Sequence, residues 1–369
     1  MKRVLILTIA FLMIAGLAVS VFTGCAKKEK AEEATLSVGI VLPTKDEPRW
    51  LQDEARFNAL LKEAGYSVEI LFSQGDPAKE RANVETLISK GIKVLIITPH
   101  DGAAAAATAD AAAAAGVKVI SHDRLITGSR NVNFYVTFNS VDVGKAQAQY
   151  LVDNATGKGN NLYLYAGAAS DNNAFLFFQG AWEVLQPKIA DGTFVIRNSS
   201  EAVALSGKKD LSRAEQAQII GQVTTNWDFN TAKNLAEANL TAAPAAAKGV
   251  AFVLAPNDGT SRAIGDAFAA DPAITKYYST GQDVEKASVQ YIIDGRQGMT
   301  VWKDVRDLTA GSIDAALAYL AGKTPNAVAT YNNGVIDVPS SNIPVISLTK
   351  ANLDKLFDSG YYSRSDFKF

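Results

Sequence analysis

Short apolar runs rich in β-branched residues alternate with helical patterns along most of this 369-residue chain. The run "TLSVGIVLP" precedes an amphipathic segment from Trp50 to Ala64, and "YSVEILFSQ" and "KVLIITP" each precede another helical segment. Because parallel strands are joined by crossovers that are usually helical, this alternation is typical of βαβ units around a parallel sheet. A second series of the same kind begins near Val141. We therefore predict an α/β fold with two doubly wound, Rossmann-like lobes.

Three segments fit this alternation less directly. "DGAAAAATADAAAAAG" is low in complexity but consists of a strong helix former, so we expect a surface helix capped by Gly116. Residues 201–226 are polar and helical in part, and we interpret them as an insertion of unknown role. The tail that follows a turn signal at Asn332 contains two more strand-like runs.

The N-terminus has the pattern of a targeting segment. Two basic residues precede the apolar run 4–22, and "FTGC" follows it. A cysteine placed directly after such a run resembles a bacterial lipobox, which predicts a lipoprotein signal peptide over 1–25 with Cys25 lipidated. Residues 26–34 would then form a polar tether. An uncleaved membrane anchor is the alternative. Either way we expect a protein exported to the periplasm or cell surface and held at a bacterial membrane.

Composition excludes several classes of function. The net charge is −2 with no basic stripe, which gives no indication of nucleic-acid binding. One cysteine and two histidines are too few for disulfides, thiolate metal clusters or a His-based zinc site. The chain has no G-x-G-x-x-G, P-loop or G-x-S-x-G motif, so we predict no enzyme and no cofactor. A carboxylate pair for acid–base work, and a carboxylate-bound calcium ion, remain open on counting alone.

Planar, charged and aromatic side chains cluster where the predicted strands end. In open α/β sheets, ligands bind beyond the carboxyl ends of the strands. The residues at these ends are Lys45, Arg49, Trp50, His122, Asp123, Arg124, Phe138, Asn139, Asp171, Asn172, Asn173, Asn257, Asp258, Gln282, Asp283, Trp302 and Lys303, with Trp227 before its own helix. Charge-assisted hydrogen bonds suit sugar hydroxyls, and aromatic rings suit the C–H faces of a pyranose. The pattern therefore favours a sugar site.

Structural roles are open for several of these residues. The asparagines at 172–173 and Asp258 also suit helix N-caps, and Asp123 and Asp283 also suit strand-end turns. Trp227 is also compatible with a core position. For His122 we favour a buried structural role over direct ligand contact.

At these positions the chain resembles the type I periplasmic monosaccharide-binding proteins of ABC importers, in the xylose-binding and multiple-sugar-binding branch. The motifs that carry the resemblance include "VTFNSVDVG", "DNNAFLFFQGA", "PNDG", "TVWKD" and "YNNGV". The resemblance implies a three-crossing hinge, with an N-terminal lobe of 35–138 plus 305–333 and a C-terminal lobe of 140–303 plus 336–369. It implies that sugar is bound by Arg49, Trp50, Asp123, Arg124, Asn173, Phe177, Trp227, Asn257, Asp283 and Lys303.

The same resemblance sets the expected ligand and partners. We expect a pyranose aldose such as xylose, glucose, galactose or arabinose, and delivery to the membrane permease of an ABC transporter. A sugar sensor that presents its ligand to a chemoreceptor is the alternative. Lys45, His122, Asn139 and Asn172 are further candidates for ligand binding, with Lys45 at the mouth of the cleft. The chain departs from the family where His122 replaces a usual tyrosine and Asn139 a usual aspartate.

Overall fold

The computed structural model describes residues 36–369. The predicted signal peptide, the lipidated Cys25 and the tether 26–34 lie outside the described residues. We call the elements around the first sheet the first lobe. They are β1 (Leu36–Leu42), α2 (Arg49–Glu63), β2 (Ser67–Phe72), α3 (Pro77–Ser89), β3 (Val94–Ile97), α4 (Ala105–Ala114), β4 (Lys118–His122), β5 (Phe134–Phe138), α12 (Val305–Leu320), β11 (Ala329–Asn332) and β12 (Asp337–Ile343).

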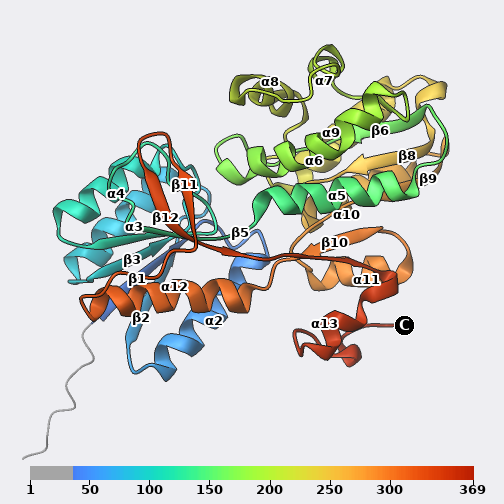
Figure 1. Ribbon diagram of the computed structural model, residues 1–369. Helices are drawn as coiled ribbons and strands as arrows, with labels where there is room; N and C mark the ends of the chain where they lie inside the picture. Colours follow the sequence, from blue (N-terminus) through green and yellow to red (C-terminus); the bar gives the residue numbers. More distant parts are fainter. Residues whose placement is uncertain (1–35) are drawn as a thin grey trace, which may run out of the picture. The chain divides into compact units, whose positions relative to one another are not determined.

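The first sheet has seven strands in the order β11-β12-β5-β4-β3-β1-β2, parallel except for β11. Helices cover both of its faces (Figure 1). In β1, Val38 and Ile40 pack with α2 and α12, while Val41 packs with α3 and α4 on the opposite face. Because both faces are buried, the strands are apolar throughout, as parallel sheets usually are.

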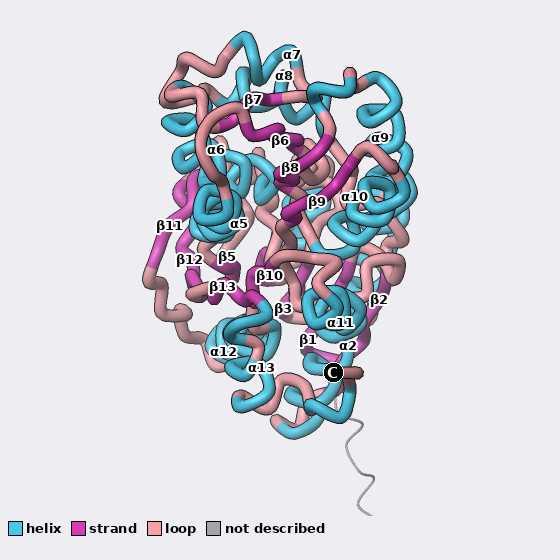
Figure 2. The backbone as a smooth tube through the Cα atoms, turned by 90° about the vertical axis from the view of Figure 1, so that its right-hand side faces the viewer, coloured by secondary structure: helices cyan, strands magenta, loops and turns pink. Residues whose placement is uncertain are grey.

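The second lobe is a separate parallel sheet in the order β7-β6-β8-β9. Figure 2 shows α5 and α6 on one face of this sheet and α9 and α10 on the other. Its elements are α5 (Ser140–Asn154), β6 (Asn160–Leu164), α6 (Asn172–Ala190), β7 (Phe194–Ile196), α7 (Ser200–Ala204), α8 (Arg213–Val223), α9 (Phe229–Ala242), β8 (Gly249–Leu254), α10 (Asp258–Ala270) and β9 (Ile274–Ser279).

A smaller cluster completes the second lobe. Strand β10 (Met299–Trp302) pairs antiparallel with β13 (Ile346–Thr349). Helices α11 (Lys286–Asp294) and α13 (Asp354–Asp358) share a core with these strands through side chains such as Val289, Leu348 and Leu356. Val301 also bridges to Gln282, which joins this cluster to the loop after β9.

The chain passes between the lobes after β5, after β10 and after β12. One boundary differs from the expectation, which placed residues 336–369 in the C-terminal lobe. Strand β12 instead lies in the first sheet, where Ser340 pairs with Tyr135 of β5 and Val338 is buried in the core. The turn signal near Gly334 closes a β11–β12 hairpin, so the last crossing follows Ile343.

The predicted insertion 201–226 is part of the second lobe's fold. Helix α8 packs against α6, and Ile219, Ile220 and Val223 are buried in the same core as Phe178 and Trp182. The indole of Trp182 donates a hydrogen bond to the Lys208 carbonyl, which ties the connecting loop down. The segment looked polar because only one stripe of this short helix carries apolar residues.

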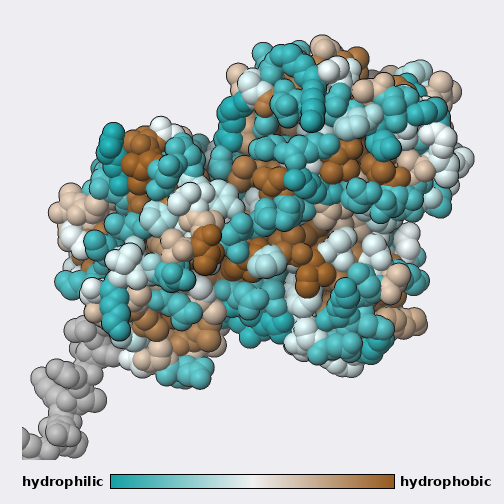
Figure 3. Space-filling view, in the orientation of Figure 1, coloured by the Kyte–Doolittle hydropathy of each residue, from teal (hydrophilic) through white to brown (hydrophobic). Residues whose placement is uncertain are grey.

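The surface of both lobes is largely hydrophilic in the view of Figure 3. An apolar patch covers the β11–β12 hairpin, where Val335 is exposed. In the described part of the chain, no helix combines the length and apolar character needed to span a bilayer.

Candidate functional site

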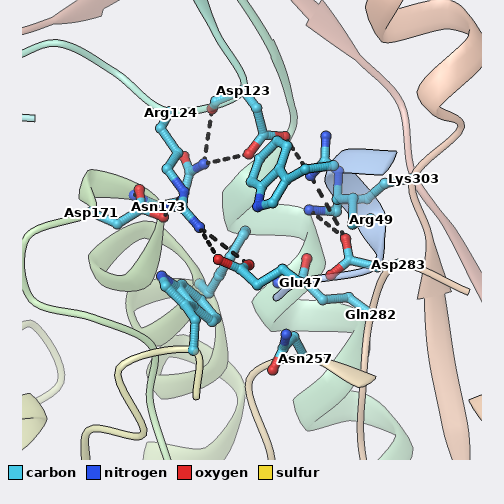
Figure 4. Close-up of a pocket in the computed structure, with 13 residues that line it drawn as sticks. Glu47, Arg49, Asp123, Arg124, Asp171, Asn173, Asn257, Gln282, Asp283 and Lys303 are labelled. Atoms are coloured by element: carbon cyan, nitrogen blue, oxygen red, sulfur yellow. Dashed lines mark hydrogen bonds and ion pairs between the residues drawn. The ribbon is translucent and has the colours of Figure 1, made fainter. Parts of the chain in front are cut away.

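A small cavity lies between the two lobes, at the carboxyl ends of strands from both sheets. Its walls are charged and aromatic, and the labelled side chains point toward a common centre in Figure 4. The residues lining it are Glu47, Arg49, Trp50, Asp123 and Arg124 of the first lobe, and Asp171, Asn173, Phe177, Trp227, Asn257, Gln282, Asp283 and Lys303 of the second.

Unusual backbone conformations position several of the side chains that line the cavity. Asp123 has φ 59°, Trp227 has φ 61° and Asp283 has φ 95°, which is the left-handed region that residues other than glycine rarely occupy. Such conformations cost on the order of 1–3 kcal/mol each and persist where the surrounding structure holds them. The first lobe supplies one of them and the second lobe two. Their concentration around one cavity indicates a functional constraint.

Arg49 is the centre of a buried ion-pair cluster. Its guanidinium lies 2.8 Å from Asp123, 3.4 Å from Asp53 and 3.8 Å from Asp283. Burial alone would lower its pKa, but these three carboxylates raise that pKa above its ordinary value. Lys303 lies 2.8 Å from Asp283 on the other side of the cluster. The contact between Arg49 and Asp283 joins the two lobes.

Asp123 is held in its charged form by the same cluster. Burial alone would raise the pKa of this carboxyl group, yet Arg49 and Lys303 lower it well below its usual range. The residue is only 4% exposed. It is therefore an anion that accepts hydrogen bonds strongly but cannot reach bulk water, which suits it to bind a hydroxyl group.

Arg124 forms a second link between the lobes. Its guanidinium lies 3.2 Å from Glu47 in the first lobe and 3.1 Å from Asp171 in the second. Burial raises the pKa of Asp171 to about 6, and the attraction of Arg124 offsets part of that effect. The pair is buried on both sides, so separating the lobes would hydrate both groups.

Neutral hydrogen bonds reinforce this contact. Asn173 Nδ2 donates to the main-chain carbonyl of Asp123 at 2.9 Å, and Tyr135 Oη donates to Asn173 Oδ1 at 3.3 Å. The main-chain amide of Gly102 donates to the Ser170 carbonyl at 3.0 Å. With both lobes in direct contact around the cavity, the structure represents a closed form.

Aromatic rings form two walls of the cavity. Trp50 lies under the guanidinium groups of Arg49 and Arg124, at 4.4 and 5.1 Å from the ring centre. On the second lobe, Phe177 and Trp227 meet edge to face, with 6.2 Å between their centroids. Gly167 is required beside Trp227, because a Cβ atom there would overlap the indole ring.

Several polar atoms on the walls are buried but have no hydrogen-bond partner among the described residues. Among them are Arg49 Nε and Nη2, Trp50 Nε1, Trp227 Nε1 and Gln282 Oε1. Leaving a buried donor or acceptor unsatisfied costs about 1–3 kcal/mol. Unpaired donors and an unpaired acceptor on residues that line one small space suit a ligand that both accepts and donates hydrogen bonds.

All ten residues predicted to bind ligand line this cavity. The four further candidates lie elsewhere. Lys45 pairs with Glu54 at the surface, Asn139 caps α5, and Asn172 accepts a hydrogen bond from Arg213. His122 is fully buried against α2 and α12, which agrees with the structural role favoured from the sequence.

Sequence reasoning did not commit to three lining residues, Glu47, Asp171 and Gln282. Asp171 and Gln282 follow predicted strands and were visible in that pattern. Asp171 in fact caps α6 while it pairs with Arg124. Across residues 36–369, no group of three or more His, Cys, Asp or Glu side chains is arranged to hold a metal ion.

Comparison with known proteins places these features in a family. The sequence model of the periplasmic binding protein domain family matches residues 38–324 of this chain. The multiple sugar-binding periplasmic receptor ChvE of Rhizobium radiobacter is 35% identical, covering 100% of both chains. The D-xylose-binding periplasmic protein of Escherichia coli is 28% identical over 91% of this chain and 94% of its own length.

A solved structure is more similar still. The carbohydrate transporter solute binding protein from Chloroflexus aurantiacus, in complex with D-glucose, is 71% identical. The two chains superpose with a TM-score of 0.89, and the match covers 90% of this chain and 98% of the Chloroflexus chain. The predicted fold class, two α/β lobes of the type I binding-protein kind, is confirmed by this match.

Proposed function

Because the chain belongs to the periplasmic binding protein family, we propose that it is the extracytoplasmic sugar-binding component of an ABC importer. Its ligand would be one pyranose aldose held between the lobes. The observation that carries this proposal is the cavity itself, where charged groups of both signs and unpaired donors face aromatic walls. Sugar hydroxyls both donate and accept, so one pyranose can satisfy many of these atoms at once.

D-Glucose is the first ligand to test. The support is the 71% identity to a protein solved with that sugar. Relatives whose names mention several sugars or D-xylose are more distant, at 35% and 28% identity. We therefore expect glucose to bind more tightly than xylose, galactose or arabinose. A site built from buried polar groups discriminates between epimers, because a misplaced hydroxyl leaves one of those groups unpaired.

Binding is expected to be reversible and without turnover. The carboxylates around the cavity are already engaged by cations, as Asp123 is by Arg49 and Asp283 by Lys303. A general acid would need a carboxyl group that keeps its proton near neutral pH and faces the reacting bond. Asp123, whose pKa is lowered, is suited to hold a hydroxyl rather than to donate a proton, and Asp171, whose pKa is raised to about 6, is ion-paired with Arg124.

Closure of the lobes would couple binding to transport. We infer that the two lobes move about the three crossings, at 138–140, 302–305 and 343–346, and that sugar favours the closed form. Both lobes contribute charged groups that are buried only when the lobes meet, such as Arg124 and Asp171. A ligand shifts such an equilibrium only by its differential affinity for the two forms. Here the sugar would contact both lobes in the closed form and one in the open form.

A thermal-shift screen tests the ligand class. The mature protein is heated with aldoses, uronic acids, polyols and amino acids, since a ligand that binds only the native state raises the melting temperature. We expect aldoses alone to raise it, and glucose to raise it most.

Asp283→Asn should lower affinity by about 2 kcal/mol, or roughly 30-fold, because Lys303 is left buried without its anion. Glu85→Gln, at an exposed ion pair with Arg81, is the matched control. Stabilisation by another class and not by aldoses would overturn the proposal.

We also propose that Cys25 anchors the protein to a membrane by a lipid. The support is the sequence pattern of a charged start, an apolar run and "TGC". Mass spectrometry of the native N-terminus should find a lipidated residue 25 and no preceding segment. An unmodified cysteine, or a retained apolar run, would contradict the anchor.

A second function, sugar sensing, is favoured by one observation. The relative that matches over the full length of both chains is named as a receptor. If this chain presents sugar to a signalling receptor, deleting its gene should abolish the cell's response to the sugar even when a separate importer supplies that sugar. A response that persists under those conditions would leave transport as the function.

A further inference from the structure

His122 lies behind the cavity rather than in it. It ends β4, directly before Asp123, and its side chain is fully buried. Its Nδ1 atom lies 2.7 Å from Ser312 Oγ of α12, and its Nε2 atom lies 2.9 Å from Asp53 Oδ1 of α2. Phe57 packs against the ring with 5.0 Å between centroids. Two helices of the first lobe, α2 and α12, therefore hold one imidazole at the end of β4.

The Asp53 carboxylate fixes the direction of one of these hydrogen bonds. A carboxylate oxygen can only accept, so His122 Nε2 donates to Asp53. The other ring nitrogen, Nδ1, pairs with the Ser312 hydroxyl, which can donate or accept. This arrangement orients Asp53 so that its second oxygen, Oδ2, lies 3.4 Å from Arg49 Nε. Asp53 and His122 are both 0% exposed, so water does not compete for these contacts.

Arg49 connects Asp53 to the cavity. Its Nη1 lies 2.8 Å from Asp123 and 3.8 Å from Asp283, while its Nη2 has no partner among the described residues. A guanidinium on a flexible stem could rotate to pair more closely with either carboxylate. Asp53, which does not line the cavity, forms an ion pair with the Nε edge at 3.4 Å, and neither Arg49 Nε nor Asp53 Oδ2 has a hydrogen-bond partner among the described residues.

We propose that His122 and Asp53 are positioning residues for Arg49. The Ser312–His122–Asp53 chain fixes the guanidinium in the orientation that binds the sugar, and neither His122 nor Asp53 touches the ligand. This inference rests on the proposed function only for the identity of the ligand. The gain in sugar affinity comes from preorganisation, because an arginine that is already oriented loses less conformational freedom on binding. Supporting groups of this kind typically change affinity by about 10–100-fold at metal sites.

Two substitutions of His122 separate the two hydrogen bonds. His122→Gln places an amide nitrogen near the position of Nε2, so it keeps the donor to Asp53. His122→Asn is shorter and reaches only the position of Nδ1, so Asp53 loses its partner. With D-glucose as the probe, we expect His122→Gln to keep its affinity within about 3-fold of that of the native protein. We expect His122→Asn to lose about 10-fold or more in affinity. Asp53→Asn should weaken binding like His122→Asn. Phe57→Leu disturbs the packing but no polar contact, and should lower the melting temperature without changing affinity.

Two readouts distinguish positioning from general destabilisation. Monodeoxy analogues of glucose show which hydroxyl loses its partner, and His122→Asn should lose affinity at the same hydroxyl as Arg49→Lys. The NMR signal of Arg49 Nε–H, measured without sugar and assigned by its absence in Arg49→Lys, should shift in His122→Asn and Asp53→Asn but not in Phe57→Leu. An unshifted signal in both polar variants, or equal loss for every deoxy analogue, would overturn the inference. If the native protein binds no aldose, the proposed function fails, while the sugar-free NMR experiment still decides the positioning role.

Discussion

Replacing the buried ion pair between Arg124 and Asp171 should reveal how the two lobes are coupled to binding. The two groups come from different lobes and lie 3.1 Å apart, and both are nearly fully buried. We consider Arg124→Gln, Asp171→Asn and the double variant. Asn at 171 keeps an oxygen to accept from the Asn173 amide, which Asp171 now does at 2.9 Å, so the cap of α6 is preserved.

The structure sets the expected size of the effect. Removing one partner of a buried pair typically costs about 3–5 kcal/mol, because the remaining charge is left uncompensated. Glu47 reduces this cost for Arg124, since it lies 3.2 Å away and is partly exposed to water. We therefore expect each single variant to lose about 2 kcal/mol of glucose affinity. The double variant leaves no unpaired Asp171, so the coupling energy should be at least about 1.5 kcal/mol.

Isothermal titration calorimetry at pH 7.5 measures the four dissociation constants of this cycle. Thermal denaturation of each sugar-free variant serves as the control for folding. Neighbouring residues in one ion-pair network show coupling, whereas independent sites add within about 0.3–0.5 kcal/mol. Additive losses in the cycle would show that the cross-lobe pair does not contribute to closure around the ligand, and the reasoning would fail.

Three further predictions follow from the site. Burial raises the pKa of Asp171 to about 6, so the folded form favours its protonated state, and the stability that this group contributes is lost as the pH rises through about 6. The stability of the native protein relative to Asp171→Asn, measured by denaturant unfolding, should fall by up to about 3 kcal/mol between pH 4 and 7, and a constant difference would contradict the assignment. Gly167→Ala should displace Trp227 and weaken glucose binding at least about 10-fold, whereas Gly221→Ala, where a Cβ meets no neighbour, should not. Exhaustive chelation should leave glucose affinity unchanged, and a loss restored by calcium would show that a metal is required.

The fold could be predicted from the sequence because its strands are local and strongly patterned. Runs such as Val94–Ile97 are short, apolar and bounded by helices, which specifies a parallel sheet buried on both faces. The third crossing was misplaced because a hairpin and a crossing share the same turn signal. Whether β12 stays beside β5 depends on an open sheet edge far away in sequence, which no local pattern at Gly334 records.

The site could be predicted in part for the same reason. Residues at strand ends converge whichever way their side chains point, so Asp123, Arg124 and Asp283 were found from position alone. Phe177 lies within α6 and came only from the family resemblance. Lys45 and Asn139 follow strands as well, but one turns to the surface and the other caps a helix. Side-chain direction depends on packing between lobes, which sequence position does not give.

The central claim is that the cavity between the lobes binds one aldose and releases it unchanged. Titration calorimetry of the mature, sugar-depleted protein with D-glucose, followed by NMR analysis of the recovered sugar, tests this most directly. The account predicts a single site per chain, intact glucose after prolonged incubation, and at least about 10-fold weaker binding in Asp283→Asn. Absence of binding heat with glucose, xylose, galactose and arabinose, or conversion of the sugar, would contradict it.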